Sequence, residues 1–153
     1  MFALDEELRR LRDALEEHAI EYAVCGGIAL GVHGFPRFTV DIDILIRPEN
    51  ETRAQSVAEE LGYLIKARPM SFSQGATEIR RISKIDPADG EVLILDFLLV
   101  TPSVEDIWRT RVSVPWHGGQ LTVVSREGLI ALKLLRSSEQ DLLDIKNLKG
   151  GDR

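Results

Sequence analysis

Residues 24–46 read VCGGIALGVHGFPRFTVDIDILI, and this stretch decides the fold. A glycine pair, Gly26 and Gly27, closes a short apolar run, and two aspartates, Asp41 and Asp43, follow inside a second apolar run. An ionised carboxylate among apolar neighbours is costly unless a partner compensates for it. The stretch therefore predicts a buried strand, a tight turn, a short helix and a second strand whose acids serve a purpose other than packing.

Asp41 and Asp43 are two residues apart, and residues i and i+2 of a strand project to the same face. Val40, Ile42 and Ile44 would then face a core. Two carboxylates held this close repel each other unless a proton or a cation lies between them. Oxygen ligands suit a hard divalent cation, so we expect a metal at this pair.

A third acid, Asp96, lies alone in the apolar run of residues 92–100. One explanation is a buried acid satisfied by a hydrogen bond or an arginine. With Asp41 and Asp43 in the same chain, a cluster of three carboxylates on adjacent strands is the better account. Such a cluster can hold two Mg²⁺ ions, or Mn²⁺, about 4 Å apart for in-line displacement at phosphorus. The hypothesis fails if Asp96 faces away from the other two acids, or if a cationic side chain shuts the ion out.

The glycine pair fits the same chemistry. Glycine lets the backbone approach a ligand closely, and the N–H groups at a helix start bind phosphate. The alternative for Gly26 and Gly27 is a tight turn without a ligand. Because two acids follow on the next strand, we predict that the pair binds phosphate.

The bulk composition is that of an ordinary globular domain. The chain has 153 residues, of which 44% are hydrophobic and 29% charged, and we expect residues 1–153 to form one domain. No apolar run approaches the ~20 residues of a membrane span. The single cysteine, Cys25, suits a reducing compartment and a buried packing role, so we expect a cytoplasmic location.

The net charge of −6 argues against broad, non-specific binding to nucleic acid. It leaves room for a local basic groove. Arg68, Arg80, Arg81 and Lys84 cluster in the middle of the chain and are the candidates for such a groove.

Hydrophobic periodicity and turn residues predict an α+β fold. We expect a small mixed sheet with helices on one side and a helical C-terminal portion. The expected helices are residues 4–18, 28–33, 50–61, 102–109, 126–135 and 139–148, with Ser103 and Ser125 as N-caps. The expected strands are residues 22–25, 40–46, 63–66, 77–85, 91–100, 112–116 and 120–124, and residues 68–75 are expected to be a loop.

The segment from Gly26 to Ile46, with Asp96 downstream, resembles the DNA-polymerase-beta-like nucleotidyltransferase superfamily. The shared pattern is a glycine turn, a short helix, Asp-x-Asp and a third acid on a later strand. The residue pattern of the segment, with His33-Gly34 and Arg37-x-Thr39, is most similar to that of small bacterial proteins related to abortive-infection nucleotidyltransferase toxins. It departs from the minimal antitoxin type, because Gly27 replaces a serine and Leu30 stands close to the place of an arginine.

This resemblance implies a nucleotidyltransferase fold and several roles. Asp41 and Asp43 would bind both metals, Asp96 would complete the site, and Gly26 and Gly27 would hold the triphosphate. Arg37 could neutralise the triphosphate, with a surface ion pair as the alternative. Thr39, which shares the face of Asp41, could contact phosphate or support a metal ligand.

The C-terminal part adds a lysine inside an apolar helical run, Lys133. A lysine there either extends outward to solvent or faces an anion. Toxin-like relatives tend to carry a helical lysine and a following aspartate near the nucleotide, so the resemblance implies Lys133 as a triphosphate contact. Asp141, or else Asp144, would orient Lys133 or Arg136; interhelical salt bridges are the plain alternative.

The favoured function is therefore metal-dependent transfer of a nucleoside monophosphate from an NTP to a hydroxyl acceptor on a tRNA, a protein or a small molecule. A toxin of a toxin–antitoxin pair, with a cognate antitoxin as partner, is the expected role. Two alternatives remain at this point. One is a non-catalytic interaction module that binds a protein through residues 68–84, and the other is an antitoxin that nucleotidylates its partner toxin.

Overall fold

The computed structural model describes residues 1–35, 41–136 and 145–149. Its helices are α1 (Leu4–Glu17), α2 (Gly26–Val32), α3 (Glu51–Glu60), α4 (Glu105–Arg109) and α5 (Arg126–Arg136), and residues 145–149 are also helical. Its strands are β1 (Tyr22–Cys25), β2 (Asp41–Ile46), β3 (Ile65–Lys66), β4 (Met70–Phe72), β5 (Thr77–Ile85), β6 (Val92–Leu99), β7 (Val112–Trp116) and β8 (Gly119–Val123). Short 3₁₀ turns at Pro48–Asn50, Ser73–Gly75 and Pro102–Val104 complete the described elements.

The strands form one mixed sheet in the order β3-β5-β6-β2-β1-β8-β7, with β4 also paired to β5. The central strand β2 runs antiparallel to β1 and parallel to β6. The hairpins β5–β6 and β7–β8 extend the sheet on either side. The expected mixed α+β sheet is confirmed.

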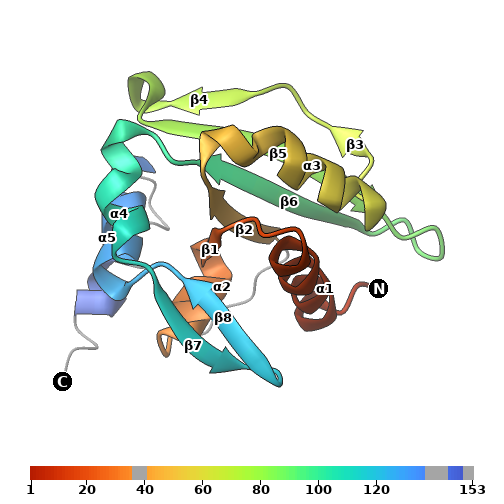
Figure 1. The fold of residues 1–153 in the computed structure, drawn as a ribbon, viewed down its shortest axis with the longest axis horizontal. Coiled ribbons are helices and arrows are strands. Elements are labelled where there is room, and N and C mark those ends of the chain that lie inside the picture. Colours follow the sequence, from red (N-terminus) through yellow and green to blue (C-terminus); the bar gives the residue numbers. More distant parts are fainter. Residues whose placement is uncertain (36–40, 137–144, 150–153) are drawn as a thin grey trace.

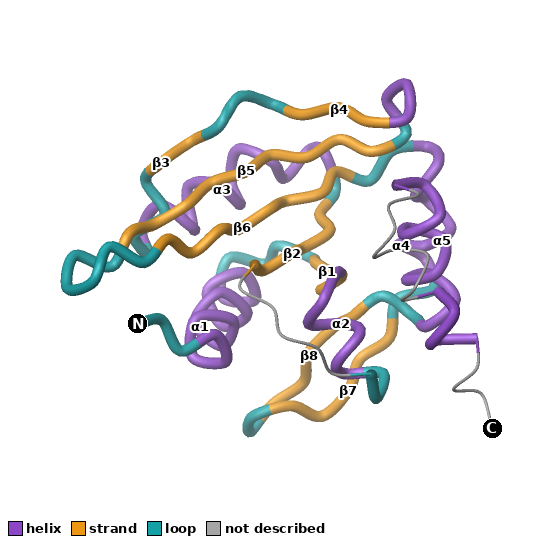
Figure 2. Tube along the Cα trace, turned by 180° about the vertical axis from the view of Figure 1, so that it is seen from behind, coloured by secondary structure: helices purple, strands orange, loops and turns teal. Residues whose placement is uncertain are grey.

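Helices cover both faces of this sheet. Figure 1 shows α1 and α3 in front of the sheet, and Figure 2, seen from behind, shows α2 on the opposite face with α4 and α5 at one end. Two hydrophobic clusters correspond to these two sides, one containing Leu8, Leu11 and Leu15 of α1, the other Leu129 and Leu132 of α5. The expected helical C-terminal portion is present, but the helices ahead of it do not share one side: α2 covers the face opposite α1 and α3 (Figure 2), because both faces of the central strands are apolar and both need a cover.

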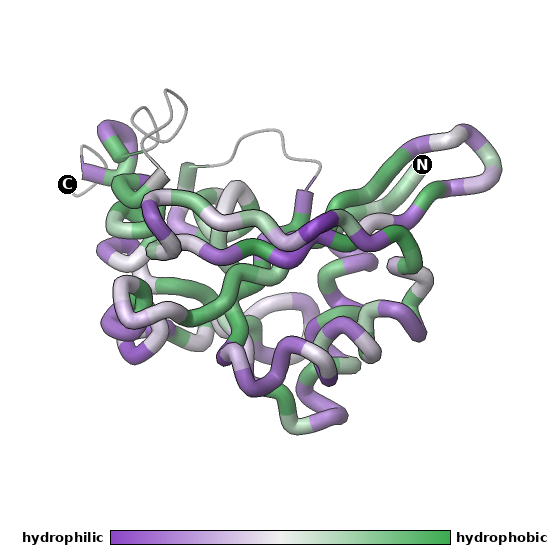
Figure 3. The backbone as a smooth tube through the Cα atoms, turned by 90° about the horizontal axis from the view of Figure 1, so that it is seen from above, coloured by the Kyte–Doolittle hydropathy of each residue, from purple (hydrophilic) through white to green (hydrophobic). Residues whose placement is uncertain are grey.

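Helix α1 shows why the outer layer forms. Its leucines recur with helical spacing, and Leu8, Leu11 and Leu15 are buried while most residues between them are exposed. Figure 3, seen from above, shows hydrophobic and hydrophilic stretches interspersed along the chain. The first turn of α1 contains Asp5, Glu6 and Glu7, and the helix dipole favours negative charge there.

Two local predictions were wrong. Residues 68–75 are not a plain loop, since Met70–Phe72 forms an edge strand against Thr77–Ile79 of β5. Such a short strand has too few residues to show an alternating pattern. Ser103 caps no helix: it lies inside a 3₁₀ turn, and α4 begins only at Glu105. Ser125 is confirmed as a cap, because its hydroxyl accepts a hydrogen bond from the N–H of Gly128 at 3.0 Å.

Candidate active site

The alternation along β2 separates the acids from the core. Ile42, Ile44 and Ile46 enter the cluster beneath α1 and α3. Asp41, Asp43 and Leu45 therefore face the α2 and α5 side, and Leu45 is buried there. The sequence-based assignment of the two acids to one face, opposite the core isoleucines, holds in the structure.

Asp96 lies on the same face as this pair. Its Cα is the register partner of Asp43 across the parallel strands β2 and β6. On the other side of β2, Cys25 of β1 is the register partner of Asp43. Asp43 thus lies between the end of β1, where Gly26 begins α2, and the third acid on β6.

Gly26 is held against Asp43. Its φ is +68°, and a Cβ placed on it would lie 2.1 Å from Oδ2 of Asp43. No side chain fits into that space, and a positive φ disfavours other residues as well. The strand-to-helix turn predicted at Gly26 and Gly27 is therefore present, although α2 begins at Gly26 itself rather than at Ile28.

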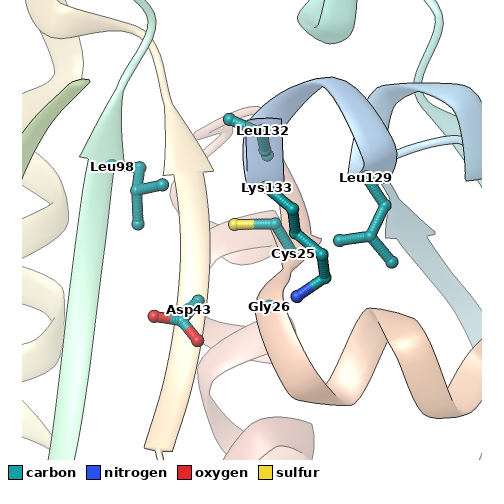
Figure 4. Close-up of a pocket in the computed structure, with 7 residues that line it drawn as sticks. All are labelled: Cys25, Gly26, Asp43, Leu98, Leu129, Leu132 and Lys133. Carbon is teal, nitrogen blue, oxygen red and sulfur yellow. The ribbon is translucent and has the colours of Figure 1, made fainter. Parts of the chain in front are cut away.

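Lys133 reaches into this region from α5. The residue is 4% exposed, so its side chain does not extend outward to solvent. Figure 4 shows its ammonium group directed toward Gly26, with Cys25 and Asp43 on the neighbouring strands. The pocket is lined by Cys25, Gly26, Asp43, Leu98, Leu129, Leu132 and Lys133. A cation, a carboxylate and a helix start thus share one small pocket.

Cys25 is a packing residue of this pocket, as the sequence indicated. It is 1% exposed and belongs to the hydrophobic cluster under α5. His33 ends α2, and its Nε2 is 2.9 Å from the carbonyl oxygen of Val124. That contact ties the end of α2 to the segment that leads into α5.

The structure adds Arg81, which the sequence reasoning did not assign to the site. Its Nε donates to Oδ1 of Asp96 at 2.8 Å and its Nη2 donates to Oδ2 at 3.0 Å. This two-bond geometry is the strong form of an arginine–carboxylate pair. The pKa of the Arg81 guanidinium is raised, first by these hydrogen bonds and then by the charges of Asp96, Asp41 and Asp43.

A signal for Arg81 was present in the sequence. The sequence predicts a turn between the two long strands, and counting outward from the pair Ile85–Val92 places Arg81 opposite Asp96, four residues along each strand. The arginine named as the alternative explanation for a buried acid is therefore in place.

Within the described ranges, no three His, Cys, Asp or Glu side chains gather closely enough to hold a metal ion by themselves.

The predicted basic groove was wrong. Arg80 and Arg81 are adjacent in β5, so their side chains project to opposite faces. Arg80 pairs with Glu51 of α3 at 3.2 Å and Lys84 pairs with Glu7 of α1, both on the far side of the sheet from Asp96. Only Arg81 of these three faces the acids, and Arg68 is exposed in the segment between β3 and β4.

Several predicted residues lie outside the described ranges. Arg37 and Thr39 fall in residues 36–40, and Asp141 and Asp144 fall in residues 137–144. Their roles stay predictions, as does that of Arg136, whose side chain is not described.

The comparisons with known proteins agree with this geometry. The model of a family described as nucleotidyl transferase AbiEii toxin, type IV TA system, matches residues 8–145. The chain belongs to the AbiEii family. The resemblance to abortive-infection nucleotidyltransferases is thereby confirmed, and the chain is a nucleotidyltransferase of the toxin type. No curated protein sequence matches this AbiEii-family chain.

Solved structures share the fold at low sequence identity. The antibiotic-resistance factor ANT(2'')-Ia is 13% identical with a TM-score of 0.65, over 97% of this chain and 83% of that one. A candidate nucleotidyltransferase from Thermotoga maritima is 18% identical with a TM-score of 0.58, over 95% and 86%. The lincosamide antibiotic adenylyltransferase LnuA is 18% identical with a TM-score of 0.53, over 95% and 96%. At these identities the likeness shows the fold alone.

One further observation bears on location. Among the helices that the structure describes, none has both the length and the apolar character needed to cross a bilayer.

Proposed function

We propose that this AbiEii-family protein transfers a nucleoside monophosphate from an NTP to a hydroxyl acceptor, with Mg²⁺ or Mn²⁺ bound at Asp41 and Asp43. The observation that carries the proposal is the pocket in which Gly26, Asp43 and Lys133 meet. The backbone start of α2 and the ammonium group of Lys133 are suited to an anionic triphosphate. The carboxylate of Asp43 lies directly beside Gly26, at the start of α2.

The donor set suits the ion. Magnesium is usually bound by one or two carboxylates together with substrate phosphates, rather than by a cage made only of protein groups. Asp41 and Asp43 supply two carboxylates on one face of β2. When bound, the ions would stabilise charge on the phosphates and lower the pKa of the attacking hydroxyl. Arg81 occupies both oxygens of Asp96, so the second ion and the participation of Asp96 as a ligand require that pair to open, and both belong to the same proposal.

The chain's own residues account for the remaining steps. Gly26, Gly27 and Lys133 orient the triphosphate, and Leu98, Leu129 and Leu132 give the pocket apolar walls. The acceptor oxygen bonds to the α-phosphorus while the bond from that phosphorus to the bridging oxygen breaks, and pyrophosphate leaves. Asp96, beside Asp43, takes the hydroxyl proton once one of its bonds to Arg81 has opened. Arg37, Thr39 and Asp141 keep their predicted roles in nucleotide binding.

The partners follow from the family. An NTP is the donor, and a cognate antitoxin is the expected regulatory partner of a type IV toxin. The acceptor belongs to one of three classes, a tRNA end, a protein side chain or a small molecule, and the labelling experiment below separates them.

The test is label transfer from each of the four α-³²P-labelled NTPs, with Mg²⁺, to purified tRNA, to lysate protein or to the small-molecule fraction. We expect one acceptor class to be labelled, and we expect Asp43→Ala or EDTA to abolish labelling. Asp106→Ala is the matched control, because Asp106 is an exposed acid on α4 whose partner is the exposed Arg109. Labelling that survives Asp43→Ala would contradict the proposal. Absence of transfer and of metal-dependent NTP binding would favour the interaction module.

A further inference from the structure

Arg81 occupies a defined place in the row of site residues that crosses the sheet. The row runs from Cys25 on β1 through Asp43 on β2 and Asp96 on β6 to Arg81 on β5, each the register partner of the next. The pocket that contains Lys133 lies at the β1 end of this row. Arg81 therefore lies across the acids from that pocket, and it faces the third acid from the opposite side.

The pairing takes up both oxygens of Asp96. The Asp96 side chain is 6% exposed, so water can do little to solvate its charge, while the Arg81 side chain is 37% exposed. A buried carboxylate needs a partner to remain ionised, and Arg81 supplies one with two hydrogen bonds. A cation that binds either oxygen of Asp96 competes with one of those bonds.

We propose that Arg81 is a positioning residue that serves as the resident counter-cation of Asp96, so that a divalent ion reaches the third acid only by displacing the guanidinium. This inference rests on the proposed function, since it concerns the same acids. Its consequence is a site that binds a free divalent ion weakly, through Asp41 and Asp43. The ion that accompanies an NTP binds better, because the triphosphate offers the displaced guanidinium an anionic partner of matching geometry.

The first test measures Mn²⁺ binding without nucleotide, by electron paramagnetic resonance at pH 8. We expect Arg81→Gln to bind Mn²⁺ at least 10-fold more tightly than the unmodified protein. The double variant Arg81→Gln with Asp96→Asn should lose that gain. Arg80→Gln is the matched control, because it removes the neighbouring arginine, whose partner Glu51 lies on the other face; its Mn²⁺ affinity should equal that of the unmodified protein.

The second test uses thermal unfolding. Arg81→Gln leaves Asp96 without its cation, so the melting temperature should fall in EDTA and recover in Mn²⁺ by more than it does for the unmodified protein. Arg81→Lys provides the test if Arg81→Gln does not fold, since one ammonium group cannot make both bonds. It should also bind Mn²⁺ more tightly than the unmodified protein.

The outcomes separate the two proposals. Unchanged or weaker Mn²⁺ binding in folded Arg81 variants, with label transfer intact in the unmodified protein, overturns the role of Arg81 alone. A gain in Mn²⁺ binding that depends on Asp96, in a protein that transfers no label, supports the role of Arg81 and overturns the proposed function.

Discussion

The two faces of the sheet both carry buried charge, but they arrange it differently. Beneath α1, Glu7 accepts from Tyr63 at 2.9 Å and pairs with Lys84, which also donates to the carbonyl of Leu61. Opposing charges there are matched locally. Beneath α2 and α5, three aspartates lie on one face of the adjacent strands β2 and β6, and Arg81 and Lys133 reach the same face.

This difference identifies the side beneath α2 and α5 as the working face of the sheet. A matched buried pair contributes to one folded arrangement and leaves nothing for a ligand to neutralise. Carboxylates on one face of β2, beside a pocket that Lys133 also lines, can bind a metal ion together with a phosphate, so they indicate binding. Strand β5 demonstrates the separation within two residues, because Arg80 serves the first face through Glu51 and Arg81 serves the second through Asp96.

The largest effect is expected from Gly26→Ala on the working face. The new methyl group would overlap Oδ2 of Asp43 at 2.1 Å and displace the carboxylate. Since a misplacement of about 1 Å can reduce a rate about 100-fold, label transfer should fall at least that far. Gly118→Ala is the control, because Gly118 has a φ of +75° but open space at its Cβ. It should lose about 1 kcal/mol of stability and keep its activity. Equal activity loss in both variants would assign the effect to backbone strain.

Lys84→Met tests the opposite face. It leaves the buried Glu7 without its cation, although the Tyr63 hydroxyl still donates to it. We expect the free energy of unfolding to fall by about 2–3 kcal/mol in urea titrations, with label transfer per folded molecule unchanged. Lys66→Met, which breaks the exposed pair with Glu59, should cost below about 1 kcal/mol. A loss of activity in folded Lys84→Met would break the proposed division between the faces.

Much of this division was readable from the sequence. Apolar runs located the central strands, and Asp41, Asp43 and Asp96 stood out because acids are costly in such runs. The glycine pair marked the turn that approaches Asp43. These features depend on residues close together in the chain, for which periodicity is informative.

What the sequence reasoning missed depends on pairing between strands. Arg81 acquires its meaning only from the β5–β6 register, and β4 only from its pairing with β5. The basic groove failed for a simpler reason, because neighbouring strand residues such as Arg80 and Arg81 cannot share a face.

Alkaline pH gives a smaller test, confined to the α1 side. Burial raises the pKa of Tyr22 to about 12, with its hydrogen bond to Glu16 acting in the same direction. The unfolded residue titrates near 10, so between these values the native state keeps a proton that the unfolded chain has released. Tyr22 therefore does not change the free energy of unfolding below about pH 10. Above that pH it lowers the free energy of unfolding by at most about 1.4 kcal/mol per pH unit.

Tyr22→Phe should remove that part of the alkaline decline, as measured by urea unfolding between pH 9 and 12. The pKa of Tyr63 is also raised, mainly by burial, so a residual decline should remain and should become smaller in the double variant with Tyr63→Phe. An unchanged slope in Tyr22→Phe would mean that Tyr22 is not the titrating group.

The smallest effect concerns Ser125, which caps the helix that carries Lys133. Ser125→Ala removes the acceptor for the Gly128 N–H and should cost about 1 kcal/mol of stability. Ser113→Ala is the control, because its hydroxyl lies 3.4 Å from that of Thr122 at an exposed position of β7. It should change stability by less than about 0.5 kcal/mol.

The capping variant also tests how α5 is held in place. Its buried leucines, Leu129 and Leu132, anchor the helix independently of the cap, so NTP affinity should weaken by no more than about threefold. A larger loss of NTP affinity at unchanged stability would mean that the first turn of α5, rather than its leucines, sets the position of Lys133. In that case the pocket would depend on the segment after β8. His33, whose ring contacts the carbonyl oxygen of Val124 in that segment, would then be the next residue to alter.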